Sequence, residues 1–144
     1  MLPHSHCFLL CYNNFVKRTK LKRKSKSETR KVQDALWQEC RRIILSRYPH
    51  VCYTCDKPVI GSNRQVGHFI PNSVGGALLR YNLDNLRIQC YYCNINLGGN
   101  GSTFYKKLLE EKGQAHIDNL FILKGQTTKA LDHYIDLLAR YASM

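Results

Sequence analysis

The chain has 144 residues, of which 22 are Lys or Arg and 10 are Asp or Glu, so its formal net charge is +12. This length suits one domain with a modest core, and the charge makes a polyanion the expected partner: nucleic acid first, an anionic membrane surface second. No apolar run approaches the roughly 20 residues that cross a bilayer, and CFLLC is too short for a secretory signal. We therefore expect a soluble, intracellular protein.

Residues 1 to 24 are predicted to form a flexible basic arm. The run KRTKLKRKSKSETRK, residues 17 to 31, is almost wholly basic and polar. Such a run is either a solvated tail or a surface for DNA phosphates, and the positive charge of the whole chain favours the phosphate contact. The side chains predicted to bind DNA in this arm are Lys17, Arg18, Lys20, Lys22, Arg23 and Lys24.

A helix is predicted over residues 25 to 48. Ser25 precedes Glu28 by three residues, which is the spacing of a capping box, and Pro49 follows the end of the pattern. Cys40 lies on the apolar stripe of this helix and is expected to pack as a small hydrophobic residue. The apolar side chains with helical spacing are Val32, Leu36, Cys40, Ile43 and Ile44.

Between residues 51 and 100, short apolar pieces are broken by Gly, Asn and Pro, which predicts a hairpin, a long ordered loop and a short helix. The predicted strand is RQVGHFI, the predicted loop is NSVGGALLRYNLDN, and CYYCNINL is expected to form one or two helical turns. Helices are predicted again between residues 102 and 142. The first has Ser102 as N-cap and Gly113 as its stop, and the last, residues 128 to 141, carries Leu131, Tyr134, Leu138 and Tyr141 on one face.

The cysteines indicate a metal site. Seven is an odd number, which does not suit a fully paired disulfide framework. Two CxxC pairs supply four thiolates with the spacing of a tetrahedral structural zinc site, which has no open position for water. Disulfides or free thiols are the alternatives. The predicted zinc ligands are Cys52, Cys55, Cys90 and Cys93; whether His4, His6, Cys7 and Cys11 bind a second metal stays open.

His68 lies between the two CxxC pairs, in GHFIPNSVGG followed by LDNLRIQCYYCN. This arrangement resembles the HNH, or His-Me finger, nucleases. It is closer to the phage Rap (NinG) recombination endonucleases, whose pattern is CxxC, GH, LR[FY]N.DN and QC..CN. The matching pieces here are CYTC, GHF, LRYNLDN and QCYYCN, and the resemblance spans about residues 25 to 140. It implies an α+β fold: a single domain over residues 25 to 144, in which a zinc-stapled ββα-metal core (residues 51 to 100) is flanked by N- and C-terminal α-helices.

The resemblance also implies catalytic roles. His68 would be the general base that activates water, because a neutral imidazole is available near neutral pH. Asn85, on the loop, would fix the approach of the strand and orient His68 through backbone hydrogen bonds, and Asn94 would ligate Mg²⁺ or Mn²⁺, which prefer oxygen donors. Considered alone, the histidine could be a core or surface residue, and the asparagines a turn former and a helix cap. Arg80 and Arg87 are candidates to clamp phosphate, although surface Arg is usually just solvated.

One position departs from the HNH pattern. Many HNH nucleases have a cation-binding Asp before the general base, whereas this chain has Gly67, as the Rap pattern does. Asp84, Gln65 and Asn96 are candidates to replace that ligand, and the sequence does not choose among them.

The resemblance implies a divalent-metal-dependent endodeoxyribonuclease that cleaves Holliday junctions and D-loops as a homodimer, in the cytoplasm of a phage-infected or prophage-bearing bacterium. No membrane association and no small-molecule cofactor are expected. Residue chemistry by itself supports only phosphodiester hydrolysis near bound nucleic acid. Two alternatives remain: an HNH nicking endonuclease on plain duplex DNA, and a zinc-stapled DNA-binding module without catalysis.

Overall fold

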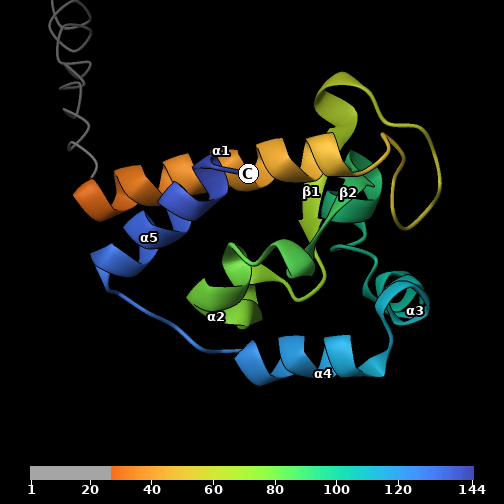
Figure 1. The fold of residues 1–144 in the computed structure, drawn as a ribbon. Coiled ribbons are helices and arrows are strands. Elements are labelled where there is room, and N and C mark those ends of the chain that lie inside the picture. Colours follow the sequence, from red (N-terminus) through yellow and green to blue (C-terminus); the bar gives the residue numbers. More distant parts are fainter. Residues whose placement is uncertain (1–26) are drawn as a thin grey trace, which may run out of the picture.

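The computed structural model describes residues 27 to 144. The predicted arm, its DNA-binding side chains between Lys17 and Lys24, and the residues considered for a second metal site all lie outside the described residues. The elements, in chain order, are α1 (Glu28–Arg47), β1 (Arg64–His68), α2 (Asn72–Arg80), β2 (Leu86–Cys90), a π-helical turn (Tyr92–Asn96), α3 (Gly101–Lys112), α4 (Gln114–Leu123) and α5 (Leu131–Ala142). The predicted α+β class is confirmed (Figure 1).

Helix α1 begins later than predicted. Its N-cap is Ser27, whose side chain accepts a hydrogen bond from the Arg30 N–H at 3.3 Å, so the predicted cap at Ser25 is wrong. The buried face of α1 is the predicted one, and Cys40 is fully buried on it. Helix α5 packs along α1 (Figure 1) and inserts Tyr134 and Tyr141 into the same core.

Strands β1 and β2 form an antiparallel hairpin. Its register pairs Arg64 with Cys90 at one end and His68 with Leu86 at the other. Because a strand rises about 3.3 Å per residue, these two ends are separated by roughly 13 Å of strand. The hairpin therefore places the cysteine end of β2 and the histidine end of β1 at opposite ends of the same sheet. Every residue of β2 is buried.

The predicted loop between the strands contains helix α2 and a 3₁₀ turn, Leu83–Asn85. Its Gly-Gly pair predicted a loop, but only one glycine breaks the helix: Gly76 has φ 78. A Cβ at Gly76 would collide with the Gln126 carbonyl, so this glycine permits a close backbone approach. Leu79 anchors α2 in a second core, whose members are Phe69, Ile70, Leu79, Phe104, Leu108, Ile117 and Leu120.

The C-terminal half is more helical than predicted. Helix α3 starts at Gly101, after Asn100 in a left-handed conformation, so the predicted cap at Ser102 is wrong, whereas the stop at Gly113 is confirmed. Helix α4 lies within residues 102 to 142, where helices were predicted, but its own bounds were not predicted, because its apolar residues lack a strong one-sided pattern. None of the described helices is both long and apolar enough to cross a membrane.

Candidate metal centre and active site

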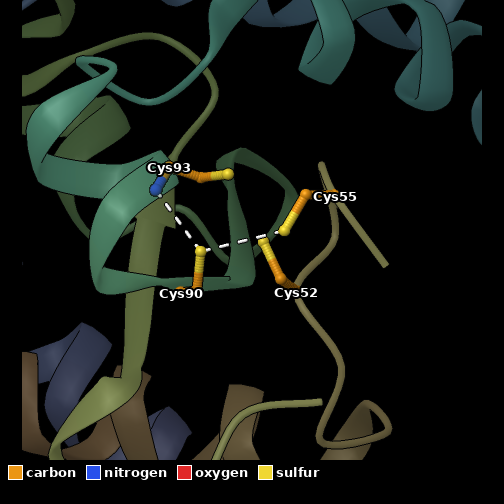
Figure 2. Close-up of side chains that lie close together, drawn as sticks. All are labelled: Cys52, Cys55, Cys90 and Cys93. Atoms are coloured by element: carbon orange, nitrogen blue, oxygen red, sulfur yellow. Dashed lines mark hydrogen bonds between the residues drawn. The ribbon is translucent and has the colours of Figure 1, made fainter. Parts of the chain in front are cut away.

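The two CxxC pairs converge on one point (Figure 2). Their four sulfur atoms lie within 4.8 Å of one another, and Sγ of Cys55 is 3.8 Å from Sγ of Cys90. Tetrahedral zinc with bonds of about 2.3 Å requires sulfur atoms about 3.8 Å apart. The cluster of Cys52, Cys55, Cys90 and Cys93 could therefore hold a structural metal such as zinc.

Each pair is positioned by a local turn. Cys52 donates its N–H to the Lys57 carbonyl at 2.8 Å, and its own carbonyl accepts the Asp56 N–H at 2.9 Å. These bonds close the turn that carries Cys52 and Cys55, which we call the first knuckle. Cys90 ends β2, and its sulfur accepts the Cys93 N–H at 3.4 Å at the start of the helical turn. Backbone N–H groups directed at sulfur favour the thiolate form, which is the form that binds metal.

The thiols of this cluster differ in how readily they ionise. Burial opposes the Cys52 thiolate, but hydrogen bonds from the Thr54 hydroxyl and from backbone N–H groups outweigh it and lower the pKa of Cys52 to about 6. Burial and the neighbouring thiols raise the pKa of Cys55 to about 12, and burial also raises the pKa of Cys90. Four thiolates this close repel one another unless a divalent cation lies between them.

His68, at the end of β1, is half-buried and held on two sides. Its ring stacks on Trp37 of α1, with centroids 5.3 Å apart and planes 11° apart. Its Nε2 lies 3.0 Å from the Arg80 carbonyl oxygen. A carbonyl can only accept, so Nε2 carries the hydrogen and Nδ1 is the acceptor of the neutral ring. This tautomer suits a general base acting through Nδ1.

Burial lowers the pKa of His68 below its usual 6.5, and the charge of Arg80 lowers it further, while the hydrogen bond to the Arg80 carbonyl opposes them in part. Since protonation is disfavoured in the fold, His68 is neutral at neutral pH, and the folded state loses stability as the pH falls below 6.5. The neutral form is the one that can accept a proton.

The single tryptophan of the chain makes this pKa measurable. We expect the fluorescence of Trp37 to fall on acidification, without added divalent cation, with a midpoint below pH 6.5, because a stacked imidazolium quenches the indole. In the His68→Ala variant this transition should vanish. A midpoint at or above pH 6.5 would contradict the lowered pKa.

Asn85 connects the segments around His68. It is fully buried; its Oδ1 accepts the Ile70 N–H at 2.8 Å, and its Nδ2 donates to the Ile70 and Leu79 carbonyls, each at 3.1 Å. The Phe69 N–H also reaches the Asn85 carbonyl at 2.8 Å. These bonds tie the residues after His68 to the end of α2, where Arg80 offers its carbonyl. Asn85 thus lies in the scaffold behind His68, and a part in catalysis remains a prediction.

His68 and Asn94 line the same shallow pocket, of about 220 Å³. Asn94 comes from the π-helical turn and is half-buried, and the remaining lining residues are Pro71, Asn72, Gly98 and Gly99. The sequence predicted that His68 and Asn94 belong to one site, and both line this pocket. It did not predict Trp37, because helical spacing does not reveal that this ring stacks on His68. It also did not predict Gln89, whose buried amide lies behind this pocket.

The two arginines proposed to clamp phosphate have different environments. Arg87 is 1% exposed, and its guanidinium makes a bidentate pair with Glu111, Nε to Oε2 at 3.2 Å and Nη2 to Oε1 at 3.0 Å. It also lies over the Tyr48 and Tyr53 rings. This geometry contradicts a phosphate contact for Arg87, which instead joins β2 to α3.

Arg80 is half-buried beside His68, with its guanidinium 5.6 Å from the Tyr81 ring centroid. Its Nε is buried without a hydrogen-bond partner, and no carboxylate in the described part of the chain forms an ion pair with it. Within the residues that the structure describes, Arg87 has an acidic partner and Arg80 has none, so Arg80 stays a candidate for a phosphate.

Removing Glu111 should destabilise the fold. We expect Glu111→Ala to lower the free energy of unfolding by about 2 kcal/mol, because the buried Arg87 charge is left unpaired; the cost is below that of a fully buried pair, since the carboxylate is partly exposed. Urea denaturation measures this, with the neighbouring, exposed Glu110→Ala as control. Equal losses in both variants would mean that the pair contributes little.

The chain matches the family model described as bacteriophage Lambda NinG protein over residues 11 to 144. Neither the curated proteins nor the solved structures give a significant match. The match covers nearly the whole chain, including both CxxC pairs, His68 and Asn94. The chain therefore belongs to the NinG family of bacteriophage proteins.

Proposed function

We propose that this protein is a divalent-metal-dependent endodeoxyribonuclease of the HNH, or His-Me finger, type that cleaves branched recombination intermediates. The observation that supports this most is the pocket shared by His68 and Asn94, at the end of a hairpin whose other end carries the cysteine cluster. Membership of the NinG family and a net charge of +12 support DNA as the substrate.

In this proposal the water nucleophile gives its proton to Nδ1 of His68. The Nε2–H bond to the Arg80 carbonyl keeps the ring in the required tautomer and partly stabilises the imidazolium that forms. Trp37 fixes the ring plane, and in this proposal Arg80 would hold a nonbridging phosphate oxygen. Mg²⁺ or Mn²⁺, held in part by Asn94, would stabilise negative charge on the phosphate and the departing 3′ oxygen when bound.

The cysteine cluster has a separate role. A four-cysteine zinc ion would have no open position, so it would hold the hairpin and the helical turn together without joining in the chemistry. Because Asn94 directly follows Cys93, this staple would also fix the backbone that carries the proposed cation ligand.

Selectivity for branches is supported by the family resemblance and by exposed aromatic side chains at the start of the turn that carries Asn94. Tyr91 and Tyr92, which precede Asn94, are 52% and 59% exposed. Exposed aromatic rings stack on unpaired bases, which the displaced strand of a D-loop offers and an intact duplex does not. Paired incisions across a junction require two active sites, so we further propose that the protein acts as a homodimer.

The test is cleavage of three labelled substrates of matched sequence: a four-way junction, a D-loop and a linear duplex. Zinc-loaded protein is assayed with Mg²⁺, with Mn²⁺ and without either cation; a chelator is avoided because it would remove zinc. We expect symmetric incisions in the junction only when a cation is added. Equal cutting of the duplex would favour a nicking endonuclease, and binding without cutting under any condition would favour a DNA-binding module.

A further inference from the structure

The position of the missing aspartate is filled by another side chain. Gly67 has ordinary strand backbone, so it is not required by a left-handed conformation. A Cβ at Gly67 would fall on the Gln89 carboxamide oxygen and lie 3.0 Å from Oδ1 of Asn94. Gln89 thus directs its oxygen into the space where the side chain of an Asp at position 67 would begin, at its Cβ.

The orientation of the Gln89 amide follows from its hydrogen bonds. Nε2 donates to the Gly99 carbonyl at 2.8 Å and to the Thr54 hydroxyl at 3.1 Å. The opposite orientation would bring two carbonyl oxygens together at Gly99, so the nitrogen must face that carbonyl. Oε1 is therefore the atom that faces Gly67 and Asn94.

Gln89 is fully buried, and among residues 27 to 144 its Oε1 finds no hydrogen-bond partner. Buried amide oxygens are nearly always satisfied, so an unpartnered one in a polar corner indicates a ligand. The corner lies behind two residues that line the His68 pocket, Asn94 and Gly99.

We propose that Oε1 of Gln89 is a ligand of the divalent cation, in place of the aspartate carboxylate absent at Gly67, and that it acts together with Oδ1 of Asn94. This inference rests on the proposed function, because it concerns the same cation. Two neutral amide oxygens match the preference of Mg²⁺ and Mn²⁺ for oxygen donors but add no negative charge. The site should therefore bind these cations more weakly than one containing a carboxylate.

The candidates suggested by sequence are less well placed. Gln65, opposite Gln89 in the hairpin, uses its amide nitrogen on the Ser62 carbonyl at 2.7 Å. Asp84 and Asn96 are exposed, and neither lines the His68 pocket. Gln89 alone among these four combines burial with an unpartnered oxygen directed at position 67.

The test measures Mn²⁺ affinity of the zinc-loaded, full-length protein from the electron paramagnetic resonance signal of free Mn²⁺. Gln89→Ala should weaken binding by at least about tenfold. Adding Gly67→Asp to Gln89→Ala should restore or exceed the parent affinity, because the vacated space accepts the new side chain and a carboxylate returns. Gln65→Ala, the matched control, should bind like the parent. Zinc content and thermal unfolding verify that each variant is folded.

A second measurement needs no substitution. In ¹⁵N-labelled parent protein, substoichiometric Mn²⁺ should broaden the side-chain amide signals of Gln89 and Asn94 before that of Gln65. Broadening at Asn94 without Gln89, or a folded Gln89→Ala variant with parent affinity, would overturn the role of Gln89 and leave the proposed nuclease intact. Broadening at neither residue would overturn the cation site and, with it, the metal-dependent part of the proposed function.

Discussion

Replacing His68 by alanine is expected to slow junction cleavage by about 10²- to 10⁴-fold, the usual contribution of a positioned general base. The expectation follows from the Nε2 bond to the Arg80 carbonyl, which leaves Nδ1 as the proton acceptor. Single-turnover cleavage of a labelled junction measures the rate, and a gel-shift assay without cation should show unchanged DNA binding.

The control for this variant is His133→Ala, which removes another histidine in contact with an aromatic ring, on α5, where His133 meets Tyr134 edge to face. The His133→Ala variant should cut at the parent rate.

In the parent protein, the cleavage rate should rise about tenfold per pH unit below the pKa of His68 and level off above it, because only the neutral ring accepts a proton. The bend in this profile should lie below pH 6.5. A His68→Ala protein that cuts as fast as the parent would remove His68 from the mechanism.

Loss of the metal cluster should have the largest effect on stability. We expect Cys90→Ser to lose stoichiometric zinc and cooperative unfolding, because Cys90 joins β2, the helical turn and the first knuckle. Structural zinc contributes apparent binding free energies of about 10–16 kcal/mol, comparable with the whole stability of a small domain, roughly 5–15 kcal/mol. Elemental analysis and thermal melting followed by circular dichroism measure both losses.

Cys40→Ala is the matched control, because Cys40 is also a fully buried cysteine but lies in the α1 face, with its sulfur 3.6 Å from the Tyr81 carbonyl. It should lower the melting temperature through a small cavity and keep full zinc content. Parent protein that is well folded without zinc would show that the cluster is not a metal site.

The sequence by itself predicted those features that depend on side chains and backbone within a single element. The apolar stripe of α1, the strand at RQVGH and the stop at Gly113 follow from side-chain periodicity and backbone preference. The CxxC spacing likewise predicted the cysteine cluster, since each knuckle is built within four residues. Family membership was also within reach of sequence, because its motif is carried by contiguous residues.

Only the tertiary structure decided the surroundings of the proposed active site. Residues far apart along the chain enclose His68: Trp37 stacks on it, and the Arg80 carbonyl sets its tautomer. Arg87 carries the same charge as Arg80, yet it is buried against Glu111, which no local pattern could reveal. The sequence showed only that position 67 lacks a ligating side chain; the fold showed that the Gln89 amide occupies the adjoining space. Periodicity describes one element at a time, whereas contacts between elements depend on how those elements pack.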